Sequence, residues 1–448
     1  MHTVVVGAGP AGLFTAIALV RRGRHVVVVD RDRGPGRDGA WLRRGVMQFD
    51  HAHTFRGPVV DALEAEVPDA LAAMRSAGAT VETGPDGAPL ALRIRRMMFE
   101  RALREIAARE PGLTLLSGHH VDGLRREAGR AVGVVLDGGN IEAELVIDAS
   151  GRASRVMRNL LGAAEGGPCG AAYVSRQYRL MDAAAAGPVN SPIGLSLGLA
   201  GYFAVAFLHD DRTFSITITH DGTDPRMRLL RHRPVYEAAV RAIPALADWI
   251  EPDRARPLTP VLPGGRLYNS YRSQLDPAGR PRVPGVIAVG DSVCTTTPLA
   301  GRGVALAFLQ ARALLDVLTT HRDDEVAATV EFDRWCHRNI RPWFVDHTHC
   351  DGDRLRRWAG GDVDLTRPLP SDLVVAAAGA DPALRPAVTA YDRMAALPSS
   401  LDAVQDRARA VYAAGWRPPV AAGPARDELA RLCHAVSSRE CDLVVAGA

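Results

Sequence analysis

The feature that most constrains the fold is a glycine-rich turn near the start of the chain. Residues 7–12 read Gly-Ala-Gly-Pro-Ala-Gly and lie between an apolar strand pattern at residues 3–6 and a helical apolar pattern at residues 13–20. The β-branched run at residues 25–30 predicts a second buried strand, which ends in an aspartate. Glycines in this setting allow a tight turn, a close backbone approach to a pyrophosphate and close helix–strand packing, and the helix N-terminus adds amide donors. The unit therefore predicts a dinucleotide site. Its predicted contacts are Gly7, Gly9, Ala11, Gly12, Asp30 and Arg31.

A second junction of strand and helix lies far along the chain. Residues 286–291 form a buried-strand pattern ending in Gly-Asp, and a Pro/Gly-containing loop at residues 295–303 leads into a long helical pattern. Such a helix N-terminus is suited to face an electron-rich ring, and reduced flavin carries negative charge near N1 and its C2 carbonyl. An ordinary strand, turn and helix gives the same pattern, so the residues alone leave both interpretations open.

Five motifs, taken in order, resemble those of the FAD-dependent monooxygenase superfamily that includes para-hydroxybenzoate hydroxylase. They are residues 7–12 with Asp30; Arg43-Arg44-Gly45-Val46; Arg96 with Phe99 and Leu103; residues 148–152 with Ser154 and Arg155; and Gly290-Asp291 with Pro298, Gly301 and Gly303. The resemblance covers roughly residues 1–330. It implies FAD as cofactor, with Asp291 at the ribityl chain and Pro298 over the oxygen-reacting face of the isoalloxazine. It also implies Gly301 and Gly303 at the N1 side, and Arg43 and Arg96 at the phosphates or the flavin. Pro298, Gly301 and Gly303 are the predicted catalytic residues.

A closer resemblance is to actinobacterial polyether and squalene-type flavin epoxidases. These have a similar R-x-G-V-x-Q-x-x-H-x-H run, matched here by Arg43, Gly45, Val46, Gln48, His51 and His53. The proline that usually precedes the glutamine is Met47 in this chain. The predicted cofactor contacts therefore also include Gln48, and we add Val121.

The predicted fold class is α/β. It comprises a Rossmann-like FAD-binding domain of the glutathione reductase type, an antiparallel-sheet substrate domain and a helical C-terminal region. A chain of 448 residues is long enough for several packed units. The FAD-binding domain is expected at residues 1–75, 95–165 and 276–330, the substrate domain at 76–94 and 166–275, and the helical region at 331–448.

The resemblance implies a monooxygenase, either an epoxidase or a hydroxylase, that inserts one oxygen atom from O₂ through a flavin C4a-hydroperoxide. The expected setting is bacterial secondary metabolism. No side chain is recognisable as a base for phenol activation. This favours a mostly apolar small-molecule substrate, either an alkene or an aromatic, polyketide-like compound. No second G-x-G-x-x-G occurs, so electrons are expected from transiently bound NAD(P)H or from a partner flavin reductase.

Two alternatives stay open. One is an FAD-dependent reductase or dehydrogenase, similar to the geranylgeranyl reductases, that inserts no oxygen. The other is an FAD-binding protein without catalysis. Flavin-dependent halogenation is set aside, because that family resemblance would require a lysine and a W-x-W-x-I-P motif, and this chain contains neither.

Composition and charge limit the kinds of partner that we expect for this chain. The chain has 54 basic residues, all arginine, and 51 acidic ones, for a formal net charge of +3, with no long block of like charge. Neither a nucleic-acid partner nor a membrane span is therefore expected. Six cysteines without a C-x-x-C pair, and no recognisable signal segment, favour a cytoplasmic protein. No metal site is predicted, although His51 with His53, and His347 with His349 and Cys350, are possible ligands.

Overall fold

The computed structural model describes residues 2–43, 45–152, 154 and 164–446. A five-stranded parallel sheet carries both glycine junctions. Its order is β19 (Val286–Ala288), β10 (Leu145–Asp148), β1 (His2–Val6), β2 (His25–Asp30) and β6 (Leu113–Ser117). The strands are short, β-branched and buried, as expected for a parallel sheet covered on both faces. Because parallel strands end at the same edge, the loops that follow β1 and β19 meet there.

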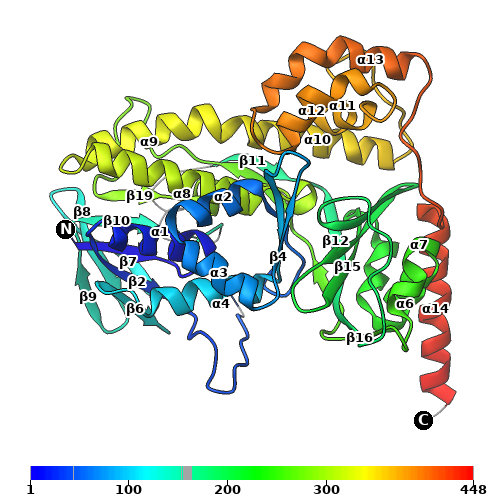
Figure 1. Ribbon diagram of the computed structural model, residues 1–448, viewed down its shortest axis with the longest axis horizontal. Helices are drawn as coiled ribbons and strands as arrows, with labels where there is room; N and C mark the ends of the chain where they lie inside the picture. Colours follow the sequence, from blue (N-terminus) through cyan, green and yellow to red (C-terminus); the bar gives the residue numbers. More distant parts are fainter. Residues whose placement is uncertain (1, 44, 153, 155–163, 447–448) are drawn as a thin grey trace.

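Helix α1 (Pro10–Arg21) packs on the strands of this sheet, and α4 (Arg96–Ala107) and α8 (Gly303–Thr320) pack on α1 (Figure 1). Helices α2 (Gly57–Glu66) and α3 (Pro68–Ser76) pack in turn on α8 and α4. Phe14 of α1 packs on Phe308 of α8, with ring centroids 4.6 Å apart. The helix after the first glycine turn is therefore held directly against the helix after the second one. A three-stranded meander of β7 (Val121–Glu127), β8 (Arg130–Leu136) and β9 (Gly139–Glu142) and a small sheet of β3 (Phe55–Arg56), β5 (Pro89–Arg93) and β4 (Thr80–Thr83) complete this part.

An antiparallel sheet forms the second large unit, as predicted. Its order is β13 (Gly194–Leu199), β14 (Tyr202–Leu208), β15 (Thr213–Asp221), β12 (Ala171–Leu180) and β16 (Ala255–Pro257), and β17 (Leu262–Gly264) also pairs with β12. One face packs on α6 (Arg233–Arg241), α7 (Pro244–Ala247) and the C-terminal helix α14 (Arg426–Ala446), around a core of its own (Figure 1). A third small sheet of β11 (Glu165–Pro168), β18 (Tyr268–Tyr271) and β20 (Cys294–Thr295) lies beside α10.

The C-terminal region is helical, as predicted, but it serves two places. The helices are α9 (Glu325–Asn339), α10 (Arg341–Trp358), α11 (Ser371–Ala377), α12 (Arg385–Asp392) and α13 (Gln405–Ala413). Helix α9 lies along α8, and α10 to α13 form a cluster above the two sheets in Figure 1. In contrast, α14 crosses to the antiparallel sheet and packs on α6. The domain boundaries given above stay a prediction.

Helix α8 amends one expectation. Its 18 residues are long and apolar enough, by length and composition, to cross a membrane, whereas no such run was expected. However, 61% of that window is buried, and α8 packs against α1, α2 and α9. Its apolar character is accounted for by its place in the core.

Candidate active site

One cavity of about 490 Å³ joins the two glycine junctions. It runs from Gly7 and Gly9, after β1, to Asp291 and Gly303, after β19. It contacts every predicted cofactor and catalytic residue except Gly12. Those residues are Gly7, Gly9, Ala11, Asp30, Arg31, Arg43, Gln48, Arg96, Val121, Asp291, Pro298, Gly301 and Gly303. Segments nearly 300 residues apart in the chain are thereby brought to one elongated site.

Two helix N-termini border this cavity, and neither is capped by a side chain. Helix α1 begins after Gly9 and helix α8 after Arg302. A Cβ built on Gly9 meets nothing within 4 Å, so the turn leaves open space where a pyrophosphate would lie. Gly12 has another role: a Cβ there would lie 1.9 Å from the Gly7 carbonyl oxygen. The structure therefore corrects the predicted contact at Gly12, which allows the helix to pack closely on the strand and does not line the cavity.

Asp30 lies at the end of β2 and is largely bonded to the protein. Its Oδ2 accepts hydrogen bonds from the Ala8 amide at 2.6 Å and from Arg43 Nη2 at 2.8 Å, and its Oδ1 accepts from the Asp32 amide at 2.7 Å. A carboxylate has about four acceptor positions, so roughly one remains for a ribose hydroxyl. The predicted ribose contact stays possible in this geometry, with Asp30 also holding the glycine turn in place.

Arg43 and Arg96 share one buried carboxylate. Glu100, on the second turn of α4, is fully buried and bonds both guanidinium groups, Arg43 through Nη1 and Arg96 through Nε at 2.5 Å. The two arginines line the cavity, but much of their bonding capacity is directed into the protein. Arg43 also pairs with Asp30 at 2.8 Å, so the carboxylates balance the two guanidinium groups. Arg96 Nη2, which makes no hydrogen bond among the described residues, is the donor that remains for a phosphate or the flavin.

His53 is fixed in a neutral form next to Arg96. Its Nδ1 lies 3.0 Å from the His51 carbonyl oxygen and its Nε2 lies 3.0 Å from Arg96 Nη1, so Nδ1 carries the proton and Nε2 accepts. Burial, together with the charge of Arg96, holds the pKa of His53 well below 6.5. Both nitrogens are therefore occupied, and His53 is not a free base.

Asp291 and Thr296 supply unused polar groups at the far end of the cavity. Within the part of the chain that the structure describes, the Asp291 carboxylate makes no hydrogen bond, and the Oγ1 of Thr296 is buried without a partner. Burial raises the pKa of Asp291, whereas the nearby Arg96 and Arg152 draw it down. Unpaired buried polar groups are costly, so this end of the site is built for a polar ligand. A ribityl chain, with its row of hydroxyls, fits that requirement, and the site as a whole fits FAD.

The loop from Thr297 to Gly303 is braced from both ends. At the start of the loop, the Thr297 amide donates to Asn269 Oδ1 at 2.6 Å, and Asn269 Nδ2 donates to Asp351 of α10 at 2.8 Å. Near its end, Arg302 is buried between Trp343 and Tyr391, 4.8 and 4.4 Å from the ring centroids. Helix α10 therefore supports the loop that carries Pro298.

The same loop shows why Gly301 must be glycine. Its φ is +62°, and an added Cβ would lie 2.6 Å from Thr54 Oγ1. Its amide donates to the Pro298 carbonyl oxygen at 2.9 Å, which closes the turn. The predicted donation from Gly301 to the flavin N1 side therefore competes with this bond, and the Gly303 amide is the better placed donor because it opens α8.

A second cavity of about 720 Å³ adjoins the first. It lies between the antiparallel sheet and the C-terminal helices, and it shares with the first cavity a wall of six residues. They are Ala52, Thr54, Tyr173, Phe207, Pro298 and Gly301. A molecule in the second cavity can therefore reach the face of a flavin next to Pro298.

Tyr173 is the polar group at this shared wall. Its ring packs edge-on against His51 at 4.8 Å and lies over Gly264 of the paired strand, where a Cβ would come within 2.3 Å of the ring. Among the described residues its hydroxyl has no hydrogen-bond partner. Burial raises its pKa to about 12, so at neutral pH it is a hydrogen-bond donor and not a base.

His347 of α10 lies in the wall of the second cavity but does not expose its nitrogens. Both ring nitrogens are buried and lack a well-formed hydrogen bond among the residues described, with the Thr297 backbone nearby. Burial, with Arg302 and Arg354, holds its pKa well below 6.5. His51 and His53, and His347 with its neighbours, gather no metal-binding set, since no group of three or more His, Cys, Asp or Glu side chains placed for a metal occurs in the described ranges.

The remaining predicted residues take simpler positions. Arg31 Nη2 donates to the Gly45 carbonyl oxygen at 3.1 Å, and Gln48 and Val121 line the cavity without a side-chain hydrogen bond in the described structure. Asp148 is fully buried and accepts from Ser150 and Ser154, so it shapes its loop. Arg44 and Arg155 of the predicted motifs lie outside the described residues.

Residues 3–159 match the family model described as FAD dependent oxidoreductase. The match identifies an FAD-dependent oxidoreductase module in that part of the chain. The chain resembles Protein FixC of Escherichia coli (strain K12), at 32% identity over 174 residues, 36% of this chain and 39% of FixC. It also resembles Menaquinone reductase of Mycolicibacterium smegmatis, at 33% identity over 156 residues, 34% of this chain and 38% of that protein. The chain thus aligns with about two fifths of the length of these curated relatives.

Solved structures extend the likeness of fold beyond the FAD-dependent oxidoreductase module. PqsL, a probable FAD-dependent monooxygenase from Pseudomonas aeruginosa, superposes with a TM-score of 0.57 at 18% identity, covering 80% of this chain and 99% of PqsL. A triple mutant of the flavin-dependent brominase Bmp2 gives a TM-score of 0.63 at 14% identity, covering 92% and 99%. At these identities the likeness shows the fold alone. It confirms the predicted flavin monooxygenase fold, and it leaves the finer epoxidase resemblance a prediction.

Sequence reasoning missed several residues of this site. Glu100 had a local signal, because it follows Arg96 by four residues on one helix and pairs of that spacing meet. Tyr173, Asn269 and Arg302 had none, since their partners are distant in the chain. The second cavity could not be predicted either, because its walls come from separate segments spread between residues 52 and 393.

Proposed function

We propose that the chain is an FAD-dependent monooxygenase that inserts one oxygen atom from O₂ into a small, mostly apolar molecule. The observation that carries this proposal is the shared wall of the two cavities at Thr54, Pro298 and Gly301. A cofactor cavity that opens at its reactive end into a second, larger and mostly apolar cavity is what oxygen transfer from a flavin to a substrate requires.

The chain's own residues would divide the work. The α1 N-terminus and the Gly9 turn would hold the pyrophosphate, Asp30 a ribose, and Asp291 with Thr296 the ribityl hydroxyls. The α8 N-terminus at Gly303 would stabilise negative charge on the ring. When bound and reduced, the flavin supplies the electrons that activate O₂ for transfer of one oxygen atom.

Tyr173 at the shared wall and His53 in the first cavity favour a substrate that needs no deprotonation. Tyr173 stays protonated, and His53 has both nitrogens occupied. Phenol activation requires a base in contact with the substrate. An alkene, or a ring that is already electron-rich, reacts without one, so we infer epoxidation or hydroxylation of such a compound, in bacterial secondary metabolism and in the cytoplasm.

Water exclusion is built into the same wall. Phe207, Leu299 and Pro298 contribute apolar surface beside the reacting face, and Thr54 and Gly301 close it from the α2 side. Removing water protects an activated oxygen from non-productive loss as peroxide. We infer that electrons come from NAD(P)H bound transiently or from a partner flavin reductase.

A second candidate is an FAD-dependent reductase. The observation that favours it is the likeness to a menaquinone reductase. That likeness covers 34% of this chain, whereas we infer that the second cavity decides between oxygen insertion and reduction.

One experiment separates these functions. The purified protein is loaded with FAD, its flavin is reduced with NAD(P)H or with an added flavin reductase, and ¹⁸O₂ is admitted with a panel of trisubstituted alkenes and electron-rich arenes. Incorporation of one ¹⁸O atom supports the monooxygenase. Reduced product without label identifies a reductase, and flavin whose reoxidation by O₂ no compound accelerates identifies a binding protein without catalysis.

A further inference from the structure

The second cavity has two unlike walls. The antiparallel sheet contributes apolar side chains such as Leu197, Phe203 and Val205. The C-terminal helices contribute a charged wall, which consists of Arg302, Asp346, Asp351, Arg354 and Asp372, with Arg56, Asp392 and Arg393 at the side. A wholly apolar substrate would make no polar contact with the charged wall, so this wall favours a substrate that carries a polar group.

Three of the four arginines are already engaged. Arg302 is buried between two aromatic rings with Asp346 at 3.4 Å. Arg56 donates to the carbonyl oxygens of Gly301, Ala300 and Asp392 at 3.2, 2.9 and 2.7 Å. Arg393 pairs with the exposed Asp86 at the rim. Arg56 and Arg393 therefore offer no free, sheltered guanidinium edge to a ligand. The Nε of Arg302 is buried without a partner, but its guanidinium group is held against the two aromatic rings.

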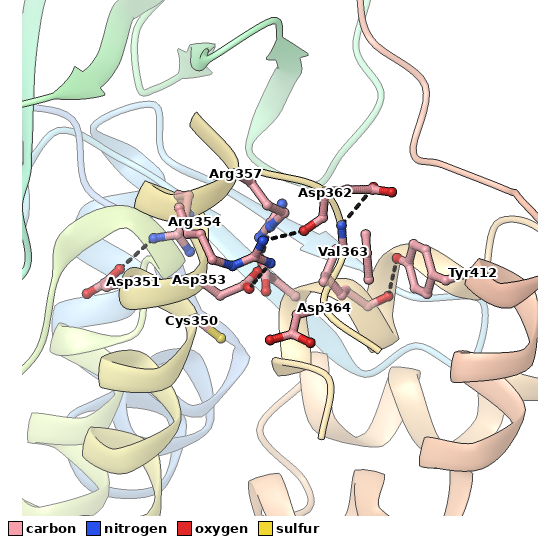
Figure 2. Close-up of polar contacts among 12 residues, drawn as sticks. Cys350, Asp351, Asp353, Arg354, Arg357, Asp362, Val363, Asp364 and Tyr412 are labelled. Atoms are coloured by element: carbon pink, nitrogen blue, oxygen red, sulfur yellow. Dashed lines mark hydrogen bonds and ion pairs between the residues drawn. The ribbon is translucent and has the colours of Figure 1, made fainter. Parts of the chain in front are cut away.

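Arg354 differs from the other three. Its Nη1 donates to Asp351 on the preceding turn of α10 (Figure 2). Its Nε and Nη2 make no hydrogen bond within the described ranges, although the side chain is only 14% exposed and lies in the cavity wall. A guanidinium has five N–H donors in a planar fork, so an edge with parallel N–H groups remains available to a ligand in the cavity.

The surrounding charges decide which ligand suits this edge. Asp351 also accepts from Asn269, so it is held in place, and Asp372 pairs with Arg357 at 2.6 Å. Each carboxylate in this wall thus has a guanidinium partner, although Asp372 shares Arg357 with Asp353. Arg354 and Asp351 are close to neutral as a pair, and the negative charge of Asp372 also acts on Arg354. Such an edge suits an oxygen acceptor that is either uncharged or singly negative.

We propose that Arg354 binds an oxygen acceptor of the substrate, either a carbonyl or a carboxylate, while the apolar part of the molecule lies along the sheet wall toward Pro298. This inference rests on the proposed function, since it treats the second cavity as the substrate site. It changes the substrate class from a mostly apolar compound to an amphiphilic one with an oxygen acceptor.

The test uses the FAD-loaded protein and three probes of matched skeleton: 4-phenylbutanoate, 5-phenylpentan-2-one and pentylbenzene. Isothermal titration calorimetry measures the affinity of each. Removing a donor that bonds an oxygen acceptor is expected to weaken binding by about 10- to 100-fold. In Arg354→Ala, the acid, the ketone or both lose affinity to that extent, and pentylbenzene keeps its affinity.

Two further variants keep the test decisive. Arg354→Lys retains the charge and the pairing with Asp351 but loses the planar edge. If the alanine variant fails to fold, the probe affinities of the lysine variant are measured instead, with the same expected loss. The control variant is Arg356→Ala. Arg356 lies on the same helix, bonds Asp353 and the Asp362 carbonyl oxygen, and does not line the cavity, so the affinities of all three probes should stay unchanged.

The outcomes separate the sources of the oxygen. Loss for the acid alone identifies a carboxylate, and loss for the acid and the ketone identifies a carbonyl oxygen of either kind. Equal binding of all three probes to the unmodified protein, or an equal loss for all three in the Arg354 variants, overturns the proposal. None of these measurements needs oxygen transfer, so the proposed monooxygenase function can fail in the ¹⁸O₂ experiment while this binding result holds.

Discussion

Arg302 braces the flavin-facing loop, and the size of its contribution to the free energy of unfolding can be predicted from its contacts. Arg302→Met keeps most of the side-chain volume but removes the charge. It abolishes two cation–π contacts, at 4.8 and 4.4 Å, each worth about 0.5–2 kcal/mol. It also leaves the buried Asp346 without a cationic partner. Removing one member of a buried ion pair costs about 3–5 kcal/mol, and the contributions overlap. We expect the free energy of unfolding to fall by about 3–5 kcal/mol.

The partners of Asp346 set the upper limit of this loss. Tyr391 donates to Asp346 Oδ2 at 2.7 Å, and Ser371 donates to its Oδ1, so the carboxylate keeps two hydrogen bonds when Arg302 is replaced. The double variant Arg302→Met with Asp346→Asn removes the unpaired charge. It should therefore recover part of the loss, giving a coupling energy of at least about 1 kcal/mol.

Urea unfolding, followed by circular dichroism with and without FAD, measures both quantities. The matched control is Arg417→Met, which removes the exposed pair with Asp362 and should cost about 1 kcal/mol or less. The dissociation constant of FAD and the yield of H₂O₂ per O₂ consumed should both rise in the Arg302 variant, because Arg302 lies between Gly301 and Gly303. A loss below about 1 kcal/mol, or a double variant no more stable than Arg302→Met, would refute the bracing role.

Three further predictions test the site and its surroundings. Gly9→Val should abolish FAD binding with little change in unfolding midpoint, since its Cβ enters open cavity, whereas Gly123→Val on β7 should leave the flavin content of the purified protein unchanged. Tyr173→Phe should divert a larger share of the consumed O₂ to H₂O₂. The yield in the unmodified protein should show no step from the Tyr173 hydroxyl between about pH 6 and 9, because its pKa is about 12; a step there that Tyr173→Phe removes would contradict the donor role. Burial lowers the pKa of His209 to about 4, below its unfolded value near 6.5, so stability present above pH 6.5 is lost as the pH falls toward 4. Urea midpoints at pH 7, 5.5 and 4.5 should show a slope of about 1.4 kcal/mol per pH unit from this group, and the slope should shrink in His209→Gln.

Much of the candidate site was predictable because many of its signals are local. Gly7 has a φ of +105°, and Asp30 follows at the end of the next strand. The coordinates add a distant constraint, since a Cβ on Gly7 would lie 2.6 Å from the Ala149 carbonyl oxygen. Pro298 and Gly303 lie in a loop before a helix, a pattern that by itself left two interpretations open, and the family resemblance implied their roles. Gly12 was placed in the right unit with the wrong role, since only coordinates show that its Cβ would meet the Gly7 carbonyl and not a ligand.

The helical C-terminal part shows the limit of such signals. Its helices were predicted from pattern, but nothing in the pattern indicated that α10 holds the flavin-facing loop or that α14 crosses to the other sheet. Arg354 and Asp351 are three residues apart on α10, a spacing at which ion pairs form on any helix. Their significance depends on what packs opposite them.

The amino-acid sequence by itself determined the elements and a dinucleotide site, because strand burial, glycine turns and helix N-termini depend mainly on residues within a few positions of one another. The family resemblance then implied FAD as the dinucleotide. Tertiary structure alone decided which side chains share a space: that the two glycine junctions border one cavity, that Tyr173 stands at its opening, and that Arg354 keeps a free edge in the next cavity. The physical reason is that desolvation and hydrogen-bond saturation depend on all atoms packed around a group, and those atoms come from every part of the chain.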